Sequence, residues 1–145
     1  MEGCAMTNDL SQHNEEIRRN LAHWRNKPAL RECYRDFHTE IAGCLSHIPD
    51  KGVVELGSGI GNIREVIPEC LRTDIFPNPW LDRQENAYRL SFGNASLSDI
   101  ILFDVFHHLE YPGTALREFH RALCPGGRVI IFEPCLSLLG LMVFG

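Results

Sequence analysis

The sequence predicts one α/β domain built around a parallel β-sheet. From residue 53 onward, short apolar runs alternate with helical patterns, which is typical of βαβ units and therefore of parallel strands. The first of these runs ends in a turn that carries three glycines at alternating positions. At 145 residues and 44% hydrophobic composition, the chain is long enough to bury a core of its own.

Two helices are predicted before the first strand. Residues 1 to about 12 are polar in composition, and we expect them to be disordered. Ile17, Leu21 and Trp24 recur at helical spacing and predict a helix that ends before Asn26. A second helix is predicted to start with Pro28 near its first turn and to stop before residues 49–52. Its apolar stripe consists of Leu30, Cys33, Tyr34, Phe37, Ile41, Cys44 and Leu45.

The strand at residues 53–56 leads directly into the glycine-rich turn. Gly57 and Gly59 lack a Cβ atom, so the backbone there can approach a ligand closely, and Gly61 allows the next helix to pack against the strand. Glu55 lies at the carboxyl end of the strand, where open α/β sheets bind their ligands. This pattern indicates a nucleotide-type pocket, although a tight turn without a ligand is an alternative.

The spacing narrows the choice of nucleotide. The dinucleotide fingerprint needs a glycine where this chain has Asn62, and the Gly-Lys-Ser/Thr of a phosphate-binding loop is absent. Residues 71–75 form a short second strand with Asp74 near its end, about 20 positions after Glu55. A carboxylate there could accept both ribose hydroxyls, or it could be an ordinary solvated aspartate.

Three further strands complete the predicted sheet. Residues 81–85 are polar and suit only an edge strand, whereas residues 98–104 form an apolar fourth strand. A helix at residues 113–123 follows, and it presents Leu116, Phe119 and Leu123 to the sheet. Cys-Pro-Gly-Gly at residues 124–127 stops this helix before the fifth strand, residues 129–132. The helix after Gly61 is short, at about residues 62–67.

Several motifs occur together in a fixed order. The acidic-x-Gly-x-Gly-x-Gly turn is followed by Asn-Ala-Tyr-Arg-Leu-Ser-Phe (86–92), His-His-Leu (107–109) and Leu-Cys-Pro-Gly-Gly (123–127). In this order they resemble the class I S-adenosylmethionine-dependent methyltransferases, type-11 small-molecule subgroup. The resemblance covers residues 53–134. It implies a Rossmann-like sheet of order 3-2-1-4-5 with flanking helices.

The resemblance also suggests how the chain is divided. Residues 1–50 would be a helical segment, either a lid over the substrate mouth or a cover for the sheet, and residues 51–145 would bind S-adenosylmethionine. The family has two more strands, for which this sequence has no room. We therefore expect a truncated chain in which residues 129–132 form an exposed edge, a site for self-association.

The resemblance assigns the cofactor residues. Glu55 and the glycine turn would bind the methionine end, together with the residues at the end of the fourth strand. Asp74 would hold the ribose, and the adenine would lie against Ile75 and the 86–87 segment, where the family usually has Asp at the first position. The implied cofactor-binding residues are Glu55, Gly57, Ser58, Gly59, Gly61, Asp74, Ile75, Asn86, Ala87, Phe103 and Asp104.

His107 and His108 lie at the expected mouth of the pocket. Either could deprotonate a hydroxyl acceptor near neutral pH, or one could pack on the following helix while the other is solvated. No metal is expected. Adjacent histidines do not converge easily on one zinc ion with Glu110, and the spacing of Cys33, His38 and Cys44 is also wrong for zinc.

Charge and composition limit the partners. The net charge is −5 and the basic residues are scattered, so we expect no nucleic-acid partner. The apolar tract at residues 135–145 is too short to span a bilayer, and no membrane association is expected. The six cysteines form no Cys-x-x-Cys pair; those at positions such as Cys33, Cys44 and Cys124 fall on core positions. We read them as reduced thiols of a cytoplasmic protein.

The expected function is methyl transfer from S-adenosylmethionine to a small-molecule acceptor by in-line displacement. The alternative is a non-catalytic, truncated protein of the same fold that acts by cofactor binding or self-association. A nicotinamide oxidoreductase is disfavoured by Asn62 and by the lack of a Tyr-x-x-x-Lys pattern.

Overall fold

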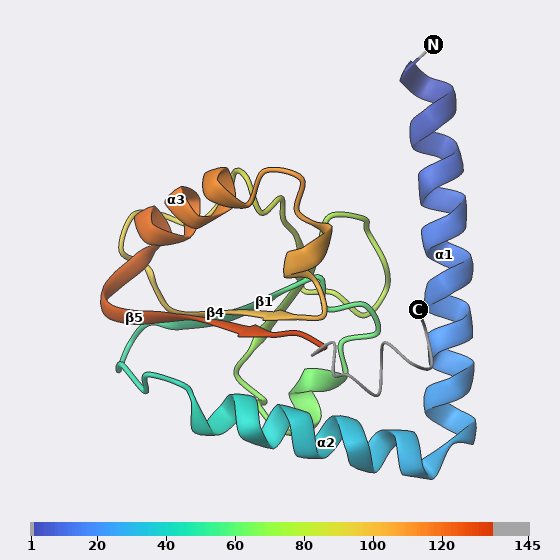
Figure 1. Cartoon of the computed structure of the whole chain (residues 1–145), viewed down its shortest axis with the longest axis horizontal. Coiled ribbons are helices and arrows are strands. Elements are labelled where there is room, and N and C mark those ends of the chain that lie inside the picture. Colours follow the sequence, from blue (N-terminus) through green and yellow to red (C-terminus); the bar gives the residue numbers. More distant parts are fainter. Residues whose placement is uncertain (1, 135–145) are drawn as a thin grey trace, which may run out of the picture.

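The computed structural model describes residues 2–134, with side chains from residue 11 onward, and it has a central parallel sheet. The strand order is β3-β2-β1-β4-β5, as predicted. Helices lie on both faces of the sheet, one above and one below (Figure 1). The strands are β1 (Gly52–Leu56), β2 (Leu71–Asp74), β3 (Arg83–Gln84), β4 (Leu97–Phe103) and β5 (Leu123–Phe132).

The described residues also form three α-helices and two short 3₁₀ helices, of which the first two precede the first strand. They are α1 (Glu2–Asn26), α2 (Pro28–Gly43), η1 (Asn62–Glu65), η2 (Phe106–His108) and α3 (Pro112–Ala122). The expectation of disorder up to about residue 12 is wrong, because α1 already begins at Glu2. No proline interrupts the chain before Pro28, and Ala, Met and Leu in the first ten residues favour a helix despite the polar composition.

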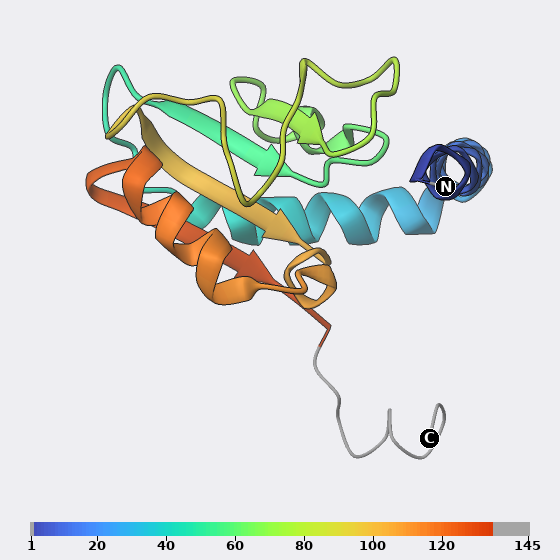
Figure 2. The ribbon, with the colours of Figure 1, turned by 90° about the horizontal axis from the view of Figure 1, so that it is seen from above.

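Helix α1 lies apart from the two helices that cover the sheet. The strands point toward it, and in both views it runs past their carboxyl ends (Figures 1 and 2). Pro28 starts α2 directly after the single residue Lys27, so the chain turns sharply between the two helices. This turn lets α2 run under the sheet while α1 closes the end of it.

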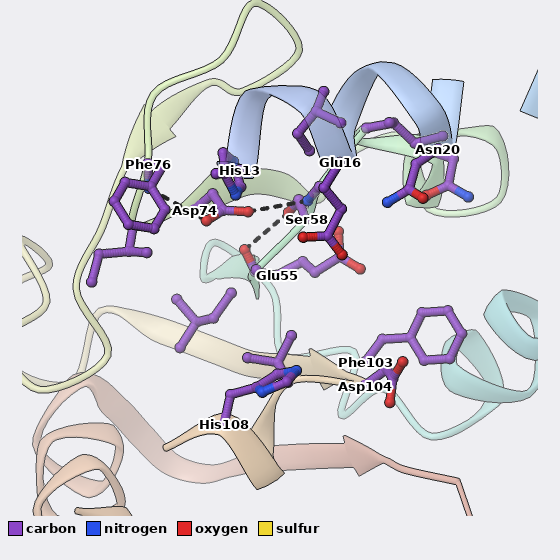
Figure 3. Close-up of a pocket in the computed structure, with 18 of the residues that line it drawn as sticks. His13, Glu16, Asn20, Glu55, Ser58, Asp74, Phe76, Phe103, Asp104 and His108 are labelled. Carbon is purple, nitrogen blue, oxygen red and sulfur yellow. Dashed lines mark hydrogen bonds between the residues drawn. The ribbon is translucent and has the colours of Figure 1, made fainter. Parts of the chain in front are cut away.

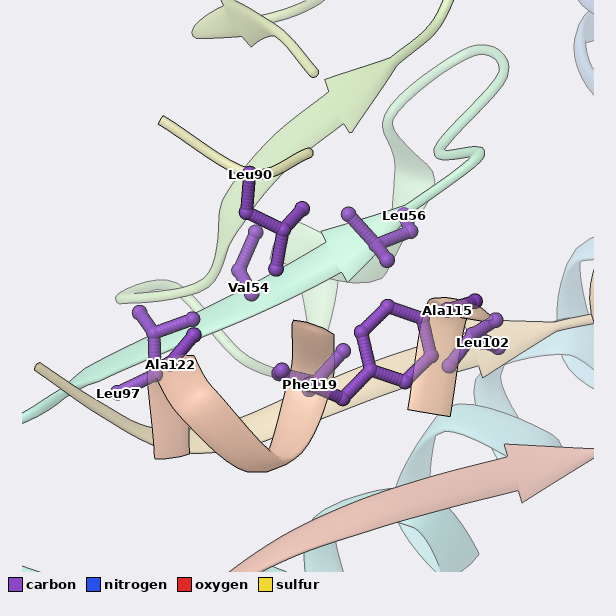
Figure 4. Packing of buried hydrophobic residues seen from close by; sticks show 9 residues of the cluster. Val54, Leu56, Leu90, Leu97, Leu102, Ala115, Phe119 and Ala122 are labelled. Atoms are coloured by element: carbon purple, nitrogen blue, oxygen red, sulfur yellow. The ribbon is translucent and has the colours of Figure 1, made fainter. Parts of the chain in front are cut away.

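Two apolar clusters hold the layers together, one on each face of the sheet. Successive residues of a strand point to opposite faces, so Val54 belongs to the cluster under α3 and Val53 to the cluster over α2. The α3 cluster packs Phe119, which is fully buried, against β1 and β4 (Figure 4). On the other face, Ile41 of α2 is buried beside Ile101 of β4.

The face that α3 presents to the sheet differs from the prediction. Leu116 is 42% exposed, whereas Ala115, Phe119 and Ala122 are fully buried. These three residues follow the i, i+4, i+7 spacing of one helix face. The predicted residues Leu116, Phe119 and Leu123 also follow a helical spacing, so periodicity alone allowed either face.

The Cys-Pro-Gly-Gly segment lies within β5, not in a turn before it. The register between β4 and β5 shifts at this point, between Leu97 and Asp99. A Cβ atom on Gly127 would lie 2.7 Å from the carbonyl oxygen of Ser98, so only glycine lets β5 approach β4 here. Helix α3 is ended by the start of this strand at Leu123.

The edges of the sheet are β3 and, in the part of the chain that the structure describes, β5. Ile131 on β5 is 42% exposed. Cys124 is buried as expected, but Cys33 and Cys44 are exposed, so the prediction that they are core residues is wrong. Within residues 2–134, no helix is long and apolar enough to cross a membrane. The predicted apolar tract at 135–145 lies outside the described residues.

Candidate functional site

A cavity of about 860 Å³ opens at the carboxyl ends of the strands. The turn after β1 and the segments that follow β2, β3 and β4 form its floor, and α1 and α2 supply residues from the opposite side (Figure 3). Its volume is near the upper end of the roughly 300–1,000 Å³ of small-molecule sites. The cavity lies where open α/β sheets bind ligands.

Most of the predicted cofactor-binding residues line this cavity. Gly61 does not, and instead lies against β2, where an added Cβ would be 2.8 Å from Cδ of Arg72. Of the two candidate bases, His108 lines the cavity and His107 does not. The predicted residues that line it are Glu55, Gly57, Ser58, Gly59, Asp74, Ile75, Asn86, Ala87, Phe103, Asp104 and His108.

The glycine turn brings bare backbone to the cavity wall. Gly57 has a φ of +75°, and a Cβ there would lie 2.5 Å from Cγ2 of Val105, so no other residue fits. Ser58 ties the turn to β2, because its backbone N–H donates to the Thr73 carbonyl at 2.8 Å and its hydroxyl accepts from Thr73 N–H at 3.0 Å. The turn is therefore fixed to β2 while its glycine backbone remains accessible from the cavity.

Asp74 is held beside this turn with its carboxylate in place. Its Oδ2 accepts a hydrogen bond from Gly59 N–H at 3.3 Å, and its Oδ1 accepts from Phe76 N–H at 3.4 Å (Figure 3). The residue is 8% exposed and lines the cavity. Both bonds are long, and each carboxylate oxygen has a further lone pair for a ligand.

Glu55 is the most unusual ionisable group of the cavity. It is 3% exposed, and its Oε2 has no hydrogen-bond partner. Burial is the main cause that raises the pKa of this carboxyl to about 7, and the nearby charge of Asp74 raises it further. A buried carboxylate without a partner is costly, which suits a site that receives a cation from a ligand.

Two other cavity residues also have buried polar atoms that lack a partner. These atoms are Nε2 of His13, on α1, and Nδ2 of Asn62, at the start of η1. The His13 ring packs on Phe76, with centroids 4.9 Å apart. With Glu55, they place donors and an acceptor from three segments around one cavity, and buried polar groups in proteins are normally paired.

The sequence left open whether the N-terminal helices form a lid or cover the sheet, and it did not identify which α1 residues line the cavity. The helix presents one face to it at a spacing of three, four and seven residues, a signal that predicts which residues share a face but not what they face. The sequence did place the apolar members Ile17 and Trp24 on one face of a helix. The α1 residues that line the cavity are His13, Glu16, Ile17, Asn20, His23 and Trp24.

The two adjacent histidines have different surroundings. His107 Nδ1 lies 2.6 Å from Oε2 of Glu133, and its ring stacks on that of His108, with centroids 3.9 Å apart. The other oxygen of Glu133 accepts from the N–H groups of Val105 and Phe106, at 3.0 and 2.6 Å. Glu133 therefore fixes the η2 turn to the end of β5. Burial raises the pKa of Glu133, but its hydrogen bond from His107 and those from the backbone leave it lowered overall.

Asp104, His107 and Glu133 are the group of possible metal ligands that residues 2–134 bring together. Asp104 Oδ1 lies 3.8 Å from His107 Nδ1. The Glu133 oxygens already accept hydrogen bonds from the η2 segment, so Glu133 and His107 support the η2 turn, and Asp104 lies exposed beside them.

The far end of the cavity is formed by the segments after β2 and β3. Ile75 is 49% exposed there, and Asn86 is exposed as well. Oδ1 of Asn86 accepts from Tyr88 N–H at 2.9 Å, which shapes the turn that carries Ala87. The side-chain NH₂ of Asn86 is the part that could face a ligand.

Comparisons with known proteins agree with this geometry. The methyltransferase domain family matches residues 54–131, and a search of curated proteins finds no match. Similar solved structures include an S-adenosylmethionine-dependent methyltransferase from Thermotoga maritima, possibly a histamine N-methyltransferase, with TM-score 0.63 and 17% identity. Another is a putative S-adenosylmethionine-dependent methyltransferase from Methanococcus maripaludis, with TM-score 0.64 and 14% identity.

The alignments cover 86% and 81% of this chain, but 63% and 62% of those two proteins. A putative methyltransferase from Haloferax volcanii, solved with the activator Trm112, has TM-score 0.52 and 20% identity over 72% of this chain and 56% of that one. The chain thus spans less than two thirds of these similar proteins, and at such identities they show the fold. Because the family match covers more than half of its length, this chain belongs to the methyltransferase domain family, with the Rossmann-like fold of class I.

Proposed function

We propose that the chain binds S-adenosylmethionine in this cavity and transfers its methyl group to a small-molecule acceptor. The observation that carries the proposal is the pair of carboxylates at the ends of neighbouring strands. Glu55 is buried with an unpaired oxygen, and Asp74 is held beside bare glycine backbone. An ammonium group and a ribose diol are the ligand groups that complement them.

The residues fit the parts of the cofactor in order along the sheet edge. Glu55 and the N–H groups of the glycine turn face the amino-acid end, and Asp74 accepts from the ribose hydroxyls. Ile75 and the Ala87 backbone lie where the adenine would pack. The unpaired Nε2 of His13 supports this fit, because a ligand in the same cavity would give it a partner.

Bound S-adenosylmethionine supplies a methyl group on a good leaving group, the sulfonium. The task of the protein is to hold the acceptor atom in line behind that methyl carbon and to exclude water. Positioning of this kind contributes up to about 7–11 kcal/mol in well-oriented systems. Helix α1 would act as the lid of the site, since its inner face lines the cavity opposite the strands.

His108 is the residue we propose as the base for an acceptor that must lose a proton. It lines the cavity, and an imidazole nitrogen can take a proton from an acceptor. His107 is a positioning residue in this scheme, because Glu133 holds its Nδ1 and its ring stacks on His108. A cavity of small-molecule size and a net charge of −5 both favour a small acceptor over a nucleic acid.

Calorimetry with S-adenosylmethionine and S-adenosylhomocysteine tests the proposal. Both should bind to the full chain, and Asp74→Ala should weaken both by about 10- to 100-fold, because it removes hydrogen bonds to a charged acceptor. Asp36→Ala, an exposed aspartate on α2, is the matched control and should bind like the wild type. If neither ligand binds at concentrations up to the millimolar range, the proposal is refuted.

A second candidate function is self-association through β5. This strand is an edge of the sheet among the described residues, and Ile131 on it is 42% exposed. Exposed strand edges with apolar side chains pair readily with another chain. Light scattering should then show a dimer that Ile131→Lys converts to a monomer. A monomer at all concentrations would leave cofactor binding as the function.

A further inference from the structure

The cavity has an aromatic wall in which Phe103, a predicted cofactor residue, is accompanied by two rings with no predicted role in cofactor binding, Trp24 and Tyr34. Trp24 of α1, Tyr34 of α2 and Phe103 of β4 all line it. The rings of Trp24 and Tyr34 have centroids 5.8 Å apart at 84°, and those of Tyr34 and Phe103 are 5.4 Å apart at 70°. Rings at nearly right angles form the sides of a corner, which a compact group can enter with aromatic surface on more than one side.

A carboxylate, that of Asp104, lies next to this corner. Asp104 follows Phe103 at the end of β4, with a φ of +58°, and its side chain lines the cavity (Figure 3). Its charge is close enough to Tyr34 to raise the pKa of that phenol, in addition to the effect of burial. The corner and the carboxylate therefore share one region of the cavity, away from Asp74.

Most of the charged side chains that line the cavity are acidic. Among the residues that the structure describes there, Lys27 is the one lysine or arginine. Glu55 and Asp74 are assigned above to the cofactor, and the resemblance places Asp104 beside its methionine end. Glu85 is already bonded to Ser91 N–H at 2.8 Å and to Arg83 at 3.4 Å. The carboxylates that line the cavity are Glu16, Glu55, Asp74, Glu85, Asp104 and Glu110.

We propose that the acceptor is a small amine, whose cationic form is held between the Trp24–Tyr34–Phe103 corner and the Asp104 carboxylate. This inference rests on the proposed function and names its acceptor class. Faces of aromatic rings attract cations, most strongly for tryptophan, and carboxylates add to that attraction. A neutral alcohol or a carboxylic acid would lose this contribution or be repelled.

The chemistry balances for such an acceptor. The bound ammonium gives one proton to His108 or to solvent, and the free nitrogen lone pair forms the bond to the methyl carbon. The bond between that carbon and sulfur breaks, and its electron pair stays on sulfur. The product is an ammonium with one more methyl group, so it carries the same positive charge as the bound substrate.

A pair of isosteric probes tests the cation preference without any turnover. Choline and 3,3-dimethylbutan-1-ol have the same shape, but only choline is charged. Each is titrated by NMR into the full chain, with and without saturating S-adenosylhomocysteine. We expect choline to bind to the loaded protein about 2- to 30-fold more tightly than the alcohol, the range of a cation–π contribution.

Three variants locate that preference. Trp24→Leu should remove most of it, whereas Trp80→Leu, the matched control outside the cavity lining, should leave it unchanged. Lys27→Met should increase choline affinity, because it removes a positive charge from the lining. Nothing in this scheme assigns Trp24 or Lys27 to the cofactor, so binding of S-adenosylhomocysteine reports separately on the fold of each variant.

The outcomes separate the two proposals. Equal binding of choline and the alcohol to loaded protein would overturn the amine acceptor and leave the proposed function intact. Choline binding that S-adenosylhomocysteine abolishes would also overturn it, since the corner would then receive the sulfonium of the cofactor. Failure of S-adenosylhomocysteine to bind refutes the proposed function, and a choline preference in that case would mark a cation site without methyl transfer.

Discussion

Two buried carboxylates on neighbouring strands differ in how their oxygens are paired. Asp99, near the start of β4, is 1% exposed and accepts from Ser46 N–H at 2.9 Å and from the Ser46 hydroxyl at 2.8 Å. Glu55, at the end of β1, is 3% exposed and has an oxygen without a partner. The two lie at opposite ends of the same sheet.

The difference separates the structural end of the sheet from the ligand-binding end. At the amino ends of the strands, Asp99 fastens the loop after α2 to the sheet, and both of its oxygens are used within the chain. At the carboxyl ends, Glu55 is positioned by the strand but left unpaired beside a cavity. A carboxylate of the first kind should matter for folding, and one of the second kind for binding.

The largest effect is expected from removing the paired carboxylate. Asp99→Ala leaves the N–H and hydroxyl of Ser46 without acceptors, and hydrogen bonds to a charged group contribute about 1.5–3 kcal/mol each. The free energy of unfolding should fall by about 3–5 kcal/mol in urea denaturation. Asp36→Ala is the control and should change it by less than about 0.5 kcal/mol. Equal stability of the two variants would break the comparison.

Removing the unpaired carboxylate of Glu55 should change the free energy of unfolding in the opposite direction. Because the pKa of Glu55 is raised from 4.5 to about 7, the folded chain binds the proton more tightly than the unfolded chain. The stabilising contribution is present below pH 4.5 and is lost as the pH rises through 7, a change of about 3 kcal/mol by pH 8. Glu55→Gln cannot ionise, so urea unfolding of this variant should lack that loss.

Three carboxylates at the carboxyl ends of the strands could be predicted, because each lies within the last two residues of a strand or directly after it. The residues Glu55, Asp74 and Asp104 are fixed by the parallel topology, which alternating apolar runs already indicate. The edge position of Arg83–Gln84 followed in the same way from its polarity. Local sequence patterns were enough to predict the position of a residue wherever the order of strands along the chain determines it.

What the sequence did not predict depends on contacts between distant segments. The periodicity of α1 defines its inner face, but the cavity that this face meets is set by the turn at Lys27 and by packing across the sheet ends. The exposure of Cys33 and Cys44 and the burial of Ala115 in place of Leu116 have the same origin. Spacing alone tells which face of a helix a side chain lies on, but it does not tell which element that face contacts.

His38 shows that an unpaired buried atom alone does not mark a ligand site. It is 1% exposed and its Nε2 has no partner, but it does not line the cavity, and its ring packs at a steep angle against the rings of Tyr34 and Phe103. Burial lowers its pKa from 6.5 to about 4, so the unfolded chain binds the proton first as the pH falls. Stability is therefore lost below pH 6.5, by about 2 kcal/mol between pH 7 and pH 5.

His38→Phe should remove this acid sensitivity, since phenylalanine fills the same aromatic environment without ionising. Urea unfolding of the variant at pH 5 and pH 7 is the measurement, with Glu55→Gln in the background so that the opposite trend of that carboxyl does not mask it. A loss that persists in His38→Phe would assign the acid sensitivity to another group.

The smallest effect is a fraction of a proton, and it tests the pairing of Glu55 most directly. With a pKa of about 7, about half of the empty molecules carry a proton on this carboxyl at pH 7. An ammonium group that binds beside it favours the charged form, so the proton is released.

Calorimetry in buffers of different ionisation enthalpy should give about 0.5 more protons released per S-adenosylmethionine in the wild type than in Glu55→Gln at pH 7. The excess should rise toward one at pH 6 and nearly vanish at pH 8, because the empty site is then protonated or already ionised. An excess of zero at all three pH values would mean that the unpaired oxygen does not meet the ligand, and Glu55 would then differ from Asp99 only in its cost to the fold.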